Sequence, residues 1–92
     1  MRYQLIVSPE MSRTIGSFGL SRQALVRLLT NVRSELEEHA DRYRHQRDPN
    51  HHDLYFRFEL HMRDQGRLRS FRFTLDDARA PERLFLVAAD EV

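Results

Sequence analysis

The 92-residue sequence contains no cysteine, which excludes disulfide bonds and thiolate metal sites and is compatible with a reducing compartment. We therefore expect a cytoplasmic protein. No apolar run reaches the roughly 18 residues that a membrane-spanning helix needs, so we expect no membrane association. With three glycines, the chain also lacks the GxxxxGK loop that holds phosphate groups between a strand and a helix.

Lysine is also missing, so all 15 basic residues are arginines. Two explanations stay open. One is a bias in genomic base composition; the other is phosphate recognition, for which the planar guanidinium group is better suited than an ammonium group. The net charge is only +1, so no overall field attracts nucleic acid. The placement of the arginines is therefore more informative than their number.

The first part of the chain predicts a short strand and a short helix. Residues 2–7 alternate weakly, and their apolar stretch is too short for a signal peptide. The Ser-Pro-Glu sequence at 8–10 combines a helix N-cap, a proline suited to the first helical turn and an acidic residue. We expect the helix to end near Gly16 or Gly19.

A longer helix is predicted after Ser21, which is a second N-cap. Apolar residues recur at spacings of three and four, which indicates one buried stripe. The predicted stripe contains Leu25, Leu29, Val32, Leu36, Ala40 and Tyr43. Together the two helices form a hairpin whose apolar stripes need a sheet to pack against.

The clearest strand is 54–63, where apolar and polar residues alternate without a break. If Gln65 and Gly66 form a two-residue turn, the following strand must run back along the first. The predicted pairs are Leu60–Phe71, Phe58–Phe73 and Phe56–Leu75 on the apolar face, and Glu59–Arg72 and His61–Ser70 on the polar face. A slip by one residue would set aromatic residues against polar ones, so the register is well specified.

The residues from Leu84 to Ala88 are continuously apolar and predict a last strand that is covered on both faces. No linker or repeat divides residues 1–92. We therefore predict a single α+β domain with an N-terminal strand, a helical hairpin and a three-strand meander. The helices should pack on one face of a four-stranded, mostly antiparallel sheet.

The polar face of the predicted hairpin is the main candidate site. It gathers a carboxylate, an imidazole and several guanidinium groups, namely Arg57, Glu59, His61, Arg63 and Arg72. Such groups can cleave RNA without a metal: Glu59 would take the proton of the 2′-hydroxyl group, and His61 would protonate the leaving oxygen. Arg57 and Arg72 would stabilise the charge on the phosphorus group. The alternative is a solvated strand face with a Glu59–Arg72 ion pair.

Two further groups have weaker signals. His45 and the sequence His51-His52-Asp53 could bind a metal, but the HxxxH and HExxH spacings are absent, and a polar loop explains them equally well. The arginines at 42, 44 and 47 could dock a phosphate backbone, or they could simply favour the C-terminal end of the helix dipole. We expect no metal and no cofactor.

The order of these elements resembles the RelE/ParE toxin superfamily. The resemblance rests on a strand at 3–7, a helical hairpin, a strand with alternating basic residues at 55–63, the turn Gly66-Arg67 and two closing strands. It implies a ribosome-dependent mRNA endonuclease, with an antitoxin as protein partner and ribosome-bound message as substrate. Arg57 then matches a basic position of the second strand, and Arg67 or Arg69 matches the arginine after the glycine. Glu59 and His61 would act as the acid–base pair.

The sequence departs from this family at its end. The family has a basic residue and a tyrosine or histidine after the last strand, whereas this chain has Ala88-Ala89-Asp90-Glu91-Val92. The stretch 76–82 is also longer than the tight turn of the family. The alternative function is therefore a non-catalytic interaction or regulatory domain, in which an exposed edge strand at 3–7 or 54–62 could pair with a partner chain, including a second copy.

Overall fold

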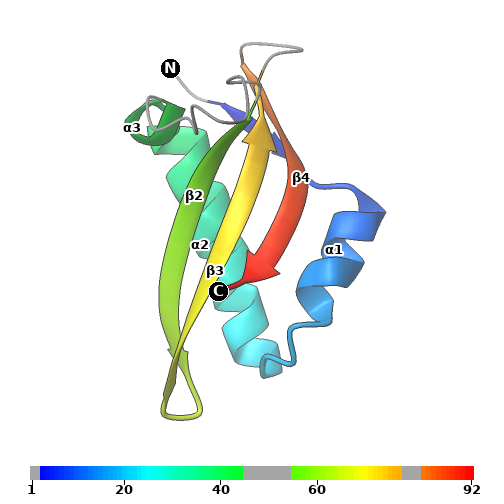
Figure 1. Cartoon of the computed structure of the whole chain (residues 1–92), viewed down its shortest axis with the longest axis vertical. Helices are drawn as coiled ribbons and strands as arrows, with labels where there is room; N and C mark the ends of the chain where they lie inside the picture. Colours follow the sequence, from blue (N-terminus) through cyan, green and yellow to red (C-terminus); the bar gives the residue numbers. More distant parts are fainter. Residues whose placement is uncertain (1–2, 45–54, 78–81) are drawn as a thin grey trace.

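The structure is a computed structural model, which describes residues 3–44, 55–77 and 82–92. In these described ranges, three helices and four strands follow one another (Figure 1). Their bounds are β1 Gln4–Ile6, α1 Pro9–Gly16, α2 Arg22–His39, α3 Asp41–Arg44, β2 Tyr55–Asp64, β3 Arg67–Asp76 and β4 Arg83–Glu91. The predicted α+β fold is confirmed.

The helices begin where the capping residues predict. Ser8 caps α1 by accepting a hydrogen bond from the backbone of Met11, and Ser21 caps α2 by accepting one from Ala24. The predicted long helix is divided, because α2 ends at His39 and α3 begins at Asp41. Within the described ranges, none of the helices combines the length and apolar character required to cross a bilayer.

The four strands form one mixed sheet in the order β1-β4-β3-β2. Strands β2, β3 and β4 are antiparallel neighbours, as predicted for a meander. Strand β1 lies parallel to β4, with Leu5 opposite Leu84. The chain must therefore cross over the sheet between β1 and β2, and this crossover contains the helices (Figure 1).

The β2–β3 hairpin has the register that the sequence predicts. Leu60 lies opposite Phe71, Phe58 opposite Phe73, and Glu59 opposite Arg72. The turn consists of Gln65 and Gly66, with φ angles of 53° and 79°. Positive φ at both positions is typical of the two-residue turns whose twist matches that of the strands.

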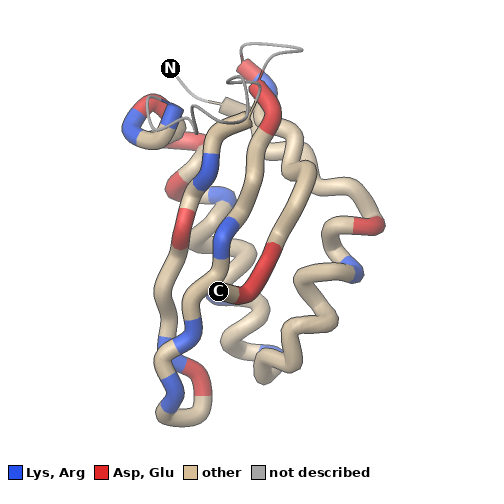
Figure 2. Tube along the Cα trace, viewed as in Figure 1, with Lys and Arg blue, Asp and Glu red and all other residues tan. Residues whose placement is uncertain are grey.

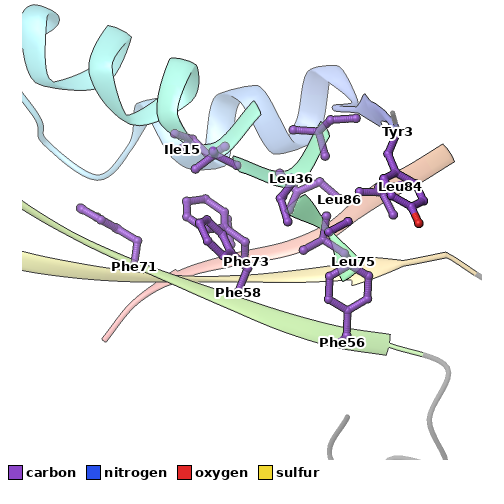
Figure 3. Packing of buried hydrophobic residues seen from close by; sticks show 14 of the residues in the cluster. Tyr3, Ile15, Leu36, Phe56, Phe58, Phe71, Phe73, Leu75, Leu84 and Leu86 are labelled. Atoms are coloured by element: carbon purple, nitrogen blue, oxygen red, sulfur yellow. The ribbon is translucent and has the colours of Figure 1, made fainter. Parts of the chain in front are cut away.

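The core lies between the helices and one face of the sheet (Figure 3). Phe56, Phe71 and Phe73 are fully buried, and Phe18 stacks on Phe71 with 5.0 Å between ring centroids. The close view shows Ile15 of α1 and Leu36 of α2 on the helical side of this core (Figure 3). Both helices therefore cover the same face of the sheet.

The predicted stripe of the long helix is wrong at Leu29, whereas Leu25 is partly buried against the core. α2 buries Ala24, Leu28, Val32 and Leu36, whereas Leu29 is 39% exposed. Leucines occupy 25, 28 and 29, so spacing alone does not decide which of them faces the sheet.

The prediction for the last strand is also wrong in one respect. β4 is longer than its apolar run and is not covered throughout: Leu84 and Leu86 are buried and Phe85 is partly buried, whereas Val87 is 41% exposed. A register shift between Thr74 and Leu75 of β3 accompanies this strand pairing.

Asp64 links the β2–β3 hairpin to the N-terminus of α2 through hydrogen bonds. Its carboxylate accepts a hydrogen bond from the backbone N–H of Ser21 at 3.1 Å and another from the Ser21 hydroxyl group at 2.8 Å. These bonds, above all the one from the backbone, hold the pKa of Asp64 below its usual range. The N-cap of α2 and the end of β2 are thus joined through one ionised side chain.

Replacing Asp64 with asparagine should make the folded state less sensitive to acid. A lowered pKa in the folded state means that Asp64 contributes stability above its unfolded pKa of about 3.9, and that this contribution is lost as the pH falls through the folded value. We expect Asp64→Asn to be less stable than the parent protein at pH 7, with a smaller difference at pH 2.5. Urea unfolding at both values measures this; an equal difference at both pH values would contradict it.

Candidate functional site

The face of the sheet away from α1 and α2 is exposed around the middle of β2 and at the turn of the hairpin, and we call it the open face. Towards the start of β2 it is covered, since Thr74 and Asp76 are buried. Because side chains alternate along a strand, it receives every second residue of the hairpin. On β2 these are Tyr55, Arg57, Glu59, His61 and Arg63, and on β3 they are Leu68, Ser70, Arg72, Thr74 and Asp76. The predicted acid–base residues therefore do share one uncovered surface.

Glu59 and Arg72 form the central ion pair of this face. The Nε and Nη2 atoms of Arg72 donate hydrogen bonds to Oε1 of Glu59 at 3.0 and 2.8 Å. Both side chains remain about two-fifths exposed, at 44% and 42%. An ion pair at this exposure contributes little to stability, about 0.2–1 kcal/mol. The pair consequently stays accessible to a ligand at low cost.

His61 lies beside this ion pair and is held by one neighbour. Its Nδ1 atom is 2.7 Å from the Ser70 hydroxyl group, which lies opposite it on β3. This hydrogen bond fixes the orientation of the ring and leaves Nε2 for another partner. Successive side chains on one face of a strand are about 7 Å apart, so Glu59 and His61 can act on two sides of one phosphodiester group.

The charges of the open face are balanced. Arg57, Arg63 and Arg72 contribute positive charge, but Arg72 lies opposite Asp90 of β4 as well as opposite Glu59. Asp76 adds a further carboxylate near the start of β2, where the Nη1 atom of Arg57 is shielded from solvent. Figure 2 shows basic and acidic positions interspersed on these strands. No continuous basic surface covers this part of the described chain.

Arg69 and Arg67 do not join the predicted site, which corrects their assignment. Arg69 lies opposite Met62, on the face that the helices cover. Its guanidinium group binds Glu91 and the carbonyl oxygen of Phe18, and its side chain is only 16% exposed. Arg67 lies opposite Asp64 at the exposed end of the hairpin. Arg69 therefore has a structural role.

The arginines after the long helix also have structural partners. Arg44 donates hydrogen bonds to Asp77 at 2.6 Å and to the Tyr3 hydroxyl group at 2.9 Å. Tyr3 in turn donates to Asp41 at 2.6 Å, so this network fastens α3 to the sheet. Arg42 lies 3.6 Å from Glu35. These contacts favour a structural reading of Arg42 and Arg44 over phosphate docking.

The possible metal-binding loop, with His45 and the sequence 51–53, lies outside the described residues, and so does Arg47. Among the residues that are described, no cluster of three histidine, aspartate or glutamate side chains could hold a metal ion.

Sequence reasoning missed a groove beside the open face, between α2 and the outer edge of β2. It has a volume of about 400 Å³ and is lined by Asn31, Ser34, Glu35, Tyr43 and the β2 residues 58–61. Tyr43 donates a 2.6 Å hydrogen bond to Glu35; burial, with this bond, raises the pKa of Tyr43 to about 12. The only sequence signal was Tyr43 at the end of the apolar stripe.

The open face thus joins a carboxylate, an imidazole and guanidinium groups on one accessible surface, while the arginines of the helical side serve the fold. No protein-family model, no curated protein and no solved structure matches this chain.

Proposed function

We propose that the protein is a toxin-type endoribonuclease that cleaves ribosome-bound message without a metal, and that the open face is its active site. The observation that carries the proposal is the exposed arrangement of Glu59, Arg72 and His61, which are neighbours on β2 and β3. The RelE/ParE resemblance of the sequence also assigns Arg57, Glu59 and His61, which lie on this surface, to the site.

The chemistry follows from the two titratable groups. Glu59 removes the proton of a 2′-hydroxyl group, whose oxygen then attacks the adjacent phosphorus atom. His61 donates a proton from Nε2 to the leaving 5′-oxygen, while Ser70 holds the opposite side of the ring. The products are a 2′,3′-cyclic phosphate and a 5′-hydroxyl group.

Arginine side chains provide charge stabilisation for this reaction. Arg72 exchanges part of its contact with Glu59 for a phosphate oxygen, which is feasible because the pair is two-fifths exposed. Arg57 and Arg63 lie on the same face and contact the neighbouring phosphates. An antitoxin would inhibit the enzyme by covering this face.

A non-catalytic interaction domain is the second candidate. It is favoured by the balance of charges on the open face, where Arg72 lies between Glu59 and Asp90. In such a domain the Glu59–Arg72 and His61–Ser70 pairs have only a structural role.

Replacing Arg57 and Arg72 with alanine should abolish growth inhibition when the protein is induced in bacterial cells. Both arginines lie on the open face, and removing the charge that faces the phosphate typically costs a factor of about 100 or more in rate. Growth curves and the decay of total message after induction measure the effect.

The matched control is the double variant Arg13→Ala and Arg22→Ala, which removes two exposed arginines from the helical side. It should inhibit growth as the parent does. Equal inhibition by the open-face variant, at equal protein level, would eliminate this surface as the active site, and harmless expression of the parent would favour the interaction domain.

A further inference from the structure

The two edge strands of the sheet, β1 and β2, differ in whether their outward backbone groups are hydrogen-bonded. At the β1 edge, Leu5 has both backbone groups bound by α2: its N–H donates to Glu37 at 3.0 Å, and its carbonyl oxygen accepts from Arg33 at 3.2 Å. Side chains of the helix thus take the places that another strand would occupy. This edge is closed to strand pairing.

The edge of β2 is open by comparison. The residues that flank a two-residue turn, here Asp64 and Arg67, form a hydrogen-bonded pair. Hydrogen-bonded and non-hydrogen-bonded pairs alternate along an antiparallel ladder, so the backbone N–H and C=O groups of residues 59, 61 and 63 point away from β3. Over 59–63 in the described structure, the only hydrogen bond recorded at this edge is a 3.5 Å contact from Arg27 to the Arg63 carbonyl oxygen. β2 also lacks the proline or bulge that commonly protects an edge strand, although it carries charged side chains.

We propose that this edge is the interface of a homodimer, in which β2 pairs antiparallel with β2 of a second copy around a two-fold axis at His61. His61 then faces His61 of the second copy, and Glu59 faces Arg63 of the second copy on each side of the axis. Both copies use the same surface, as a two-fold interface requires.

Repulsion between like charges disfavours two alternative registers, with the two-fold axis at Glu59 or at Leu60. An axis at Glu59 would place the two Glu59 side chains opposite each other, and an axis at Leu60 would place Arg57 opposite Arg63. With the axis at His61, Glu59 of each copy lies opposite Arg63 of the other copy. Glu59 can accept the second arginine, because both hydrogen bonds from Arg72 end on its Oε1 atom.

Apolar packing excludes the remaining complementary register. An axis at Phe58 would pair Arg57 with Glu59, but Phe58 is only 2% exposed, with the Tyr43 ring 4.8 Å away. It therefore has little surface left to bury. Leu60, which lines the groove, and Met62 are only partly buried, and the axis at His61 brings Leu60 against Met62 of the second copy.

The dimer would join two four-stranded sheets into one of eight strands. Directly opposite residues in an antiparallel pair point to the same face, so both open faces lie on one side. The interface would use the backbone edge together with Glu59, His61 and Arg63, whose side chains also belong to the proposed active site. The proposal does not rest on RNA cleavage, because it is tested by association of the two copies.

Because the chain has no cysteine, a single His61→Cys substitution tests the register directly. Hydrogen-bonded antiparallel pairs have Cα atoms about 5.5 Å apart, which lies within the range of a disulfide. We expect His61→Cys to form a covalent dimer under mild oxidation, at least about tenfold faster than Leu68→Cys, an exposed control on β3. Glu59→Cys should also be slow, because its copies would lie about 13 Å apart.

Crosslinking of His61→Cys at the rate of the Leu68 control, or faster crosslinking of Glu59→Cys, would overturn the proposed register. Sedimentation of the cysteine-free protein tests the dimer itself: we expect a dimer mass, and a dissociation constant more than about tenfold larger for Arg63→Glu. Arg67→Glu, at the exposed turn, should leave it unchanged. A monomer at every concentration up to 100 μM, even one that binds another protein at this edge, would refute the homodimer.

Discussion

Phe73→Ala should destabilise the folded protein more than any substitution of an exposed residue. Phe73 is fully buried at the centre of the sheet, opposite Phe58 on β2 and Ala89 on β4. Its ring stacks on Phe58 with centroids 6.1 Å apart. Removing a buried phenylalanine ring costs about 3–5 kcal/mol, and a domain of this size has a total stability of only about 5–15 kcal/mol.

Thermal unfolding followed by circular dichroism measures this loss. Each kcal/mol lowers Tm by about 4–8 °C in a domain of 60–100 residues, so the midpoint should fall by at least about 12 °C. Leu68→Ala is the matched control, because Leu68 is 64% exposed and its truncation should stay within about 0.5 kcal/mol. Equal midpoints for both variants would contradict the position of Phe73 in the core.

His61→Ala should slow cleavage of a labelled RNA by about 100- to 10,000-fold, the usual contribution of a positioned general acid or base. Glu59→Gln should have an effect of similar size, because an amide cannot take the proton of the 2′-hydroxyl group. Ser70→Ala should lose less, since Ser70 only orients the imidazole ring through its 2.7 Å hydrogen bond. Rates are compared at saturating RNA to separate catalysis from binding.

His39→Ala is the matched control for this series. Its imidazole is 40% exposed on α2, away from the open face, so removing it should leave the rate unchanged. All variants should keep the melting temperature of the parent within a few degrees, because the altered side chains are exposed or partly exposed. A full rate for His61→Ala would remove His61 from the catalytic mechanism.

The sequence predicts the hairpin well because two independent constraints agree there. The alternation of Phe56, Phe58 and Leu60 defines one buried face, and the Gln65-Gly66 turn defines the register. Helix starts are equally predictable, since Ser8 and Ser21 satisfy backbone N–H groups locally. Such local chemistry does not depend on the rest of the fold.

The features that the sequence did not predict depend on contacts between distant segments. α2 turns Leu28 toward the sheet and leaves Leu29 exposed, a choice between two leucines that periodicity does not make. The parallel pairing of β1 with β4 joins the two ends of the chain and has no local signal. Glu37 and Arg33 close the β1 edge from a helix more than twenty residues away.

Arg69 shows how the candidate site was assigned too broadly. The predicted register already places Arg69 opposite Met62, on the apolar face, whereas the family resemblance placed it with Glu59 and His61. Its partner Glu91 lies near the end of β4, beyond the apolar run that predicted that strand. For a residue on a well-specified strand, side-chain alternation was the better guide.

The most direct measurement of the central claim is the chemistry of the RNA ends that the unaltered protein produces. Translating ribosomes carrying end-labelled message are incubated with the protein in a buffer that keeps the ribosomes intact. We expect cleavage that leaves 2′,3′-cyclic phosphate and 5′-hydroxyl ends, because Glu59 and His61 act on the 2′-hydroxyl group and the leaving oxygen. Intact message, or cleavage that leaves 3′-hydroxyl and 5′-phosphate ends, would contradict the account.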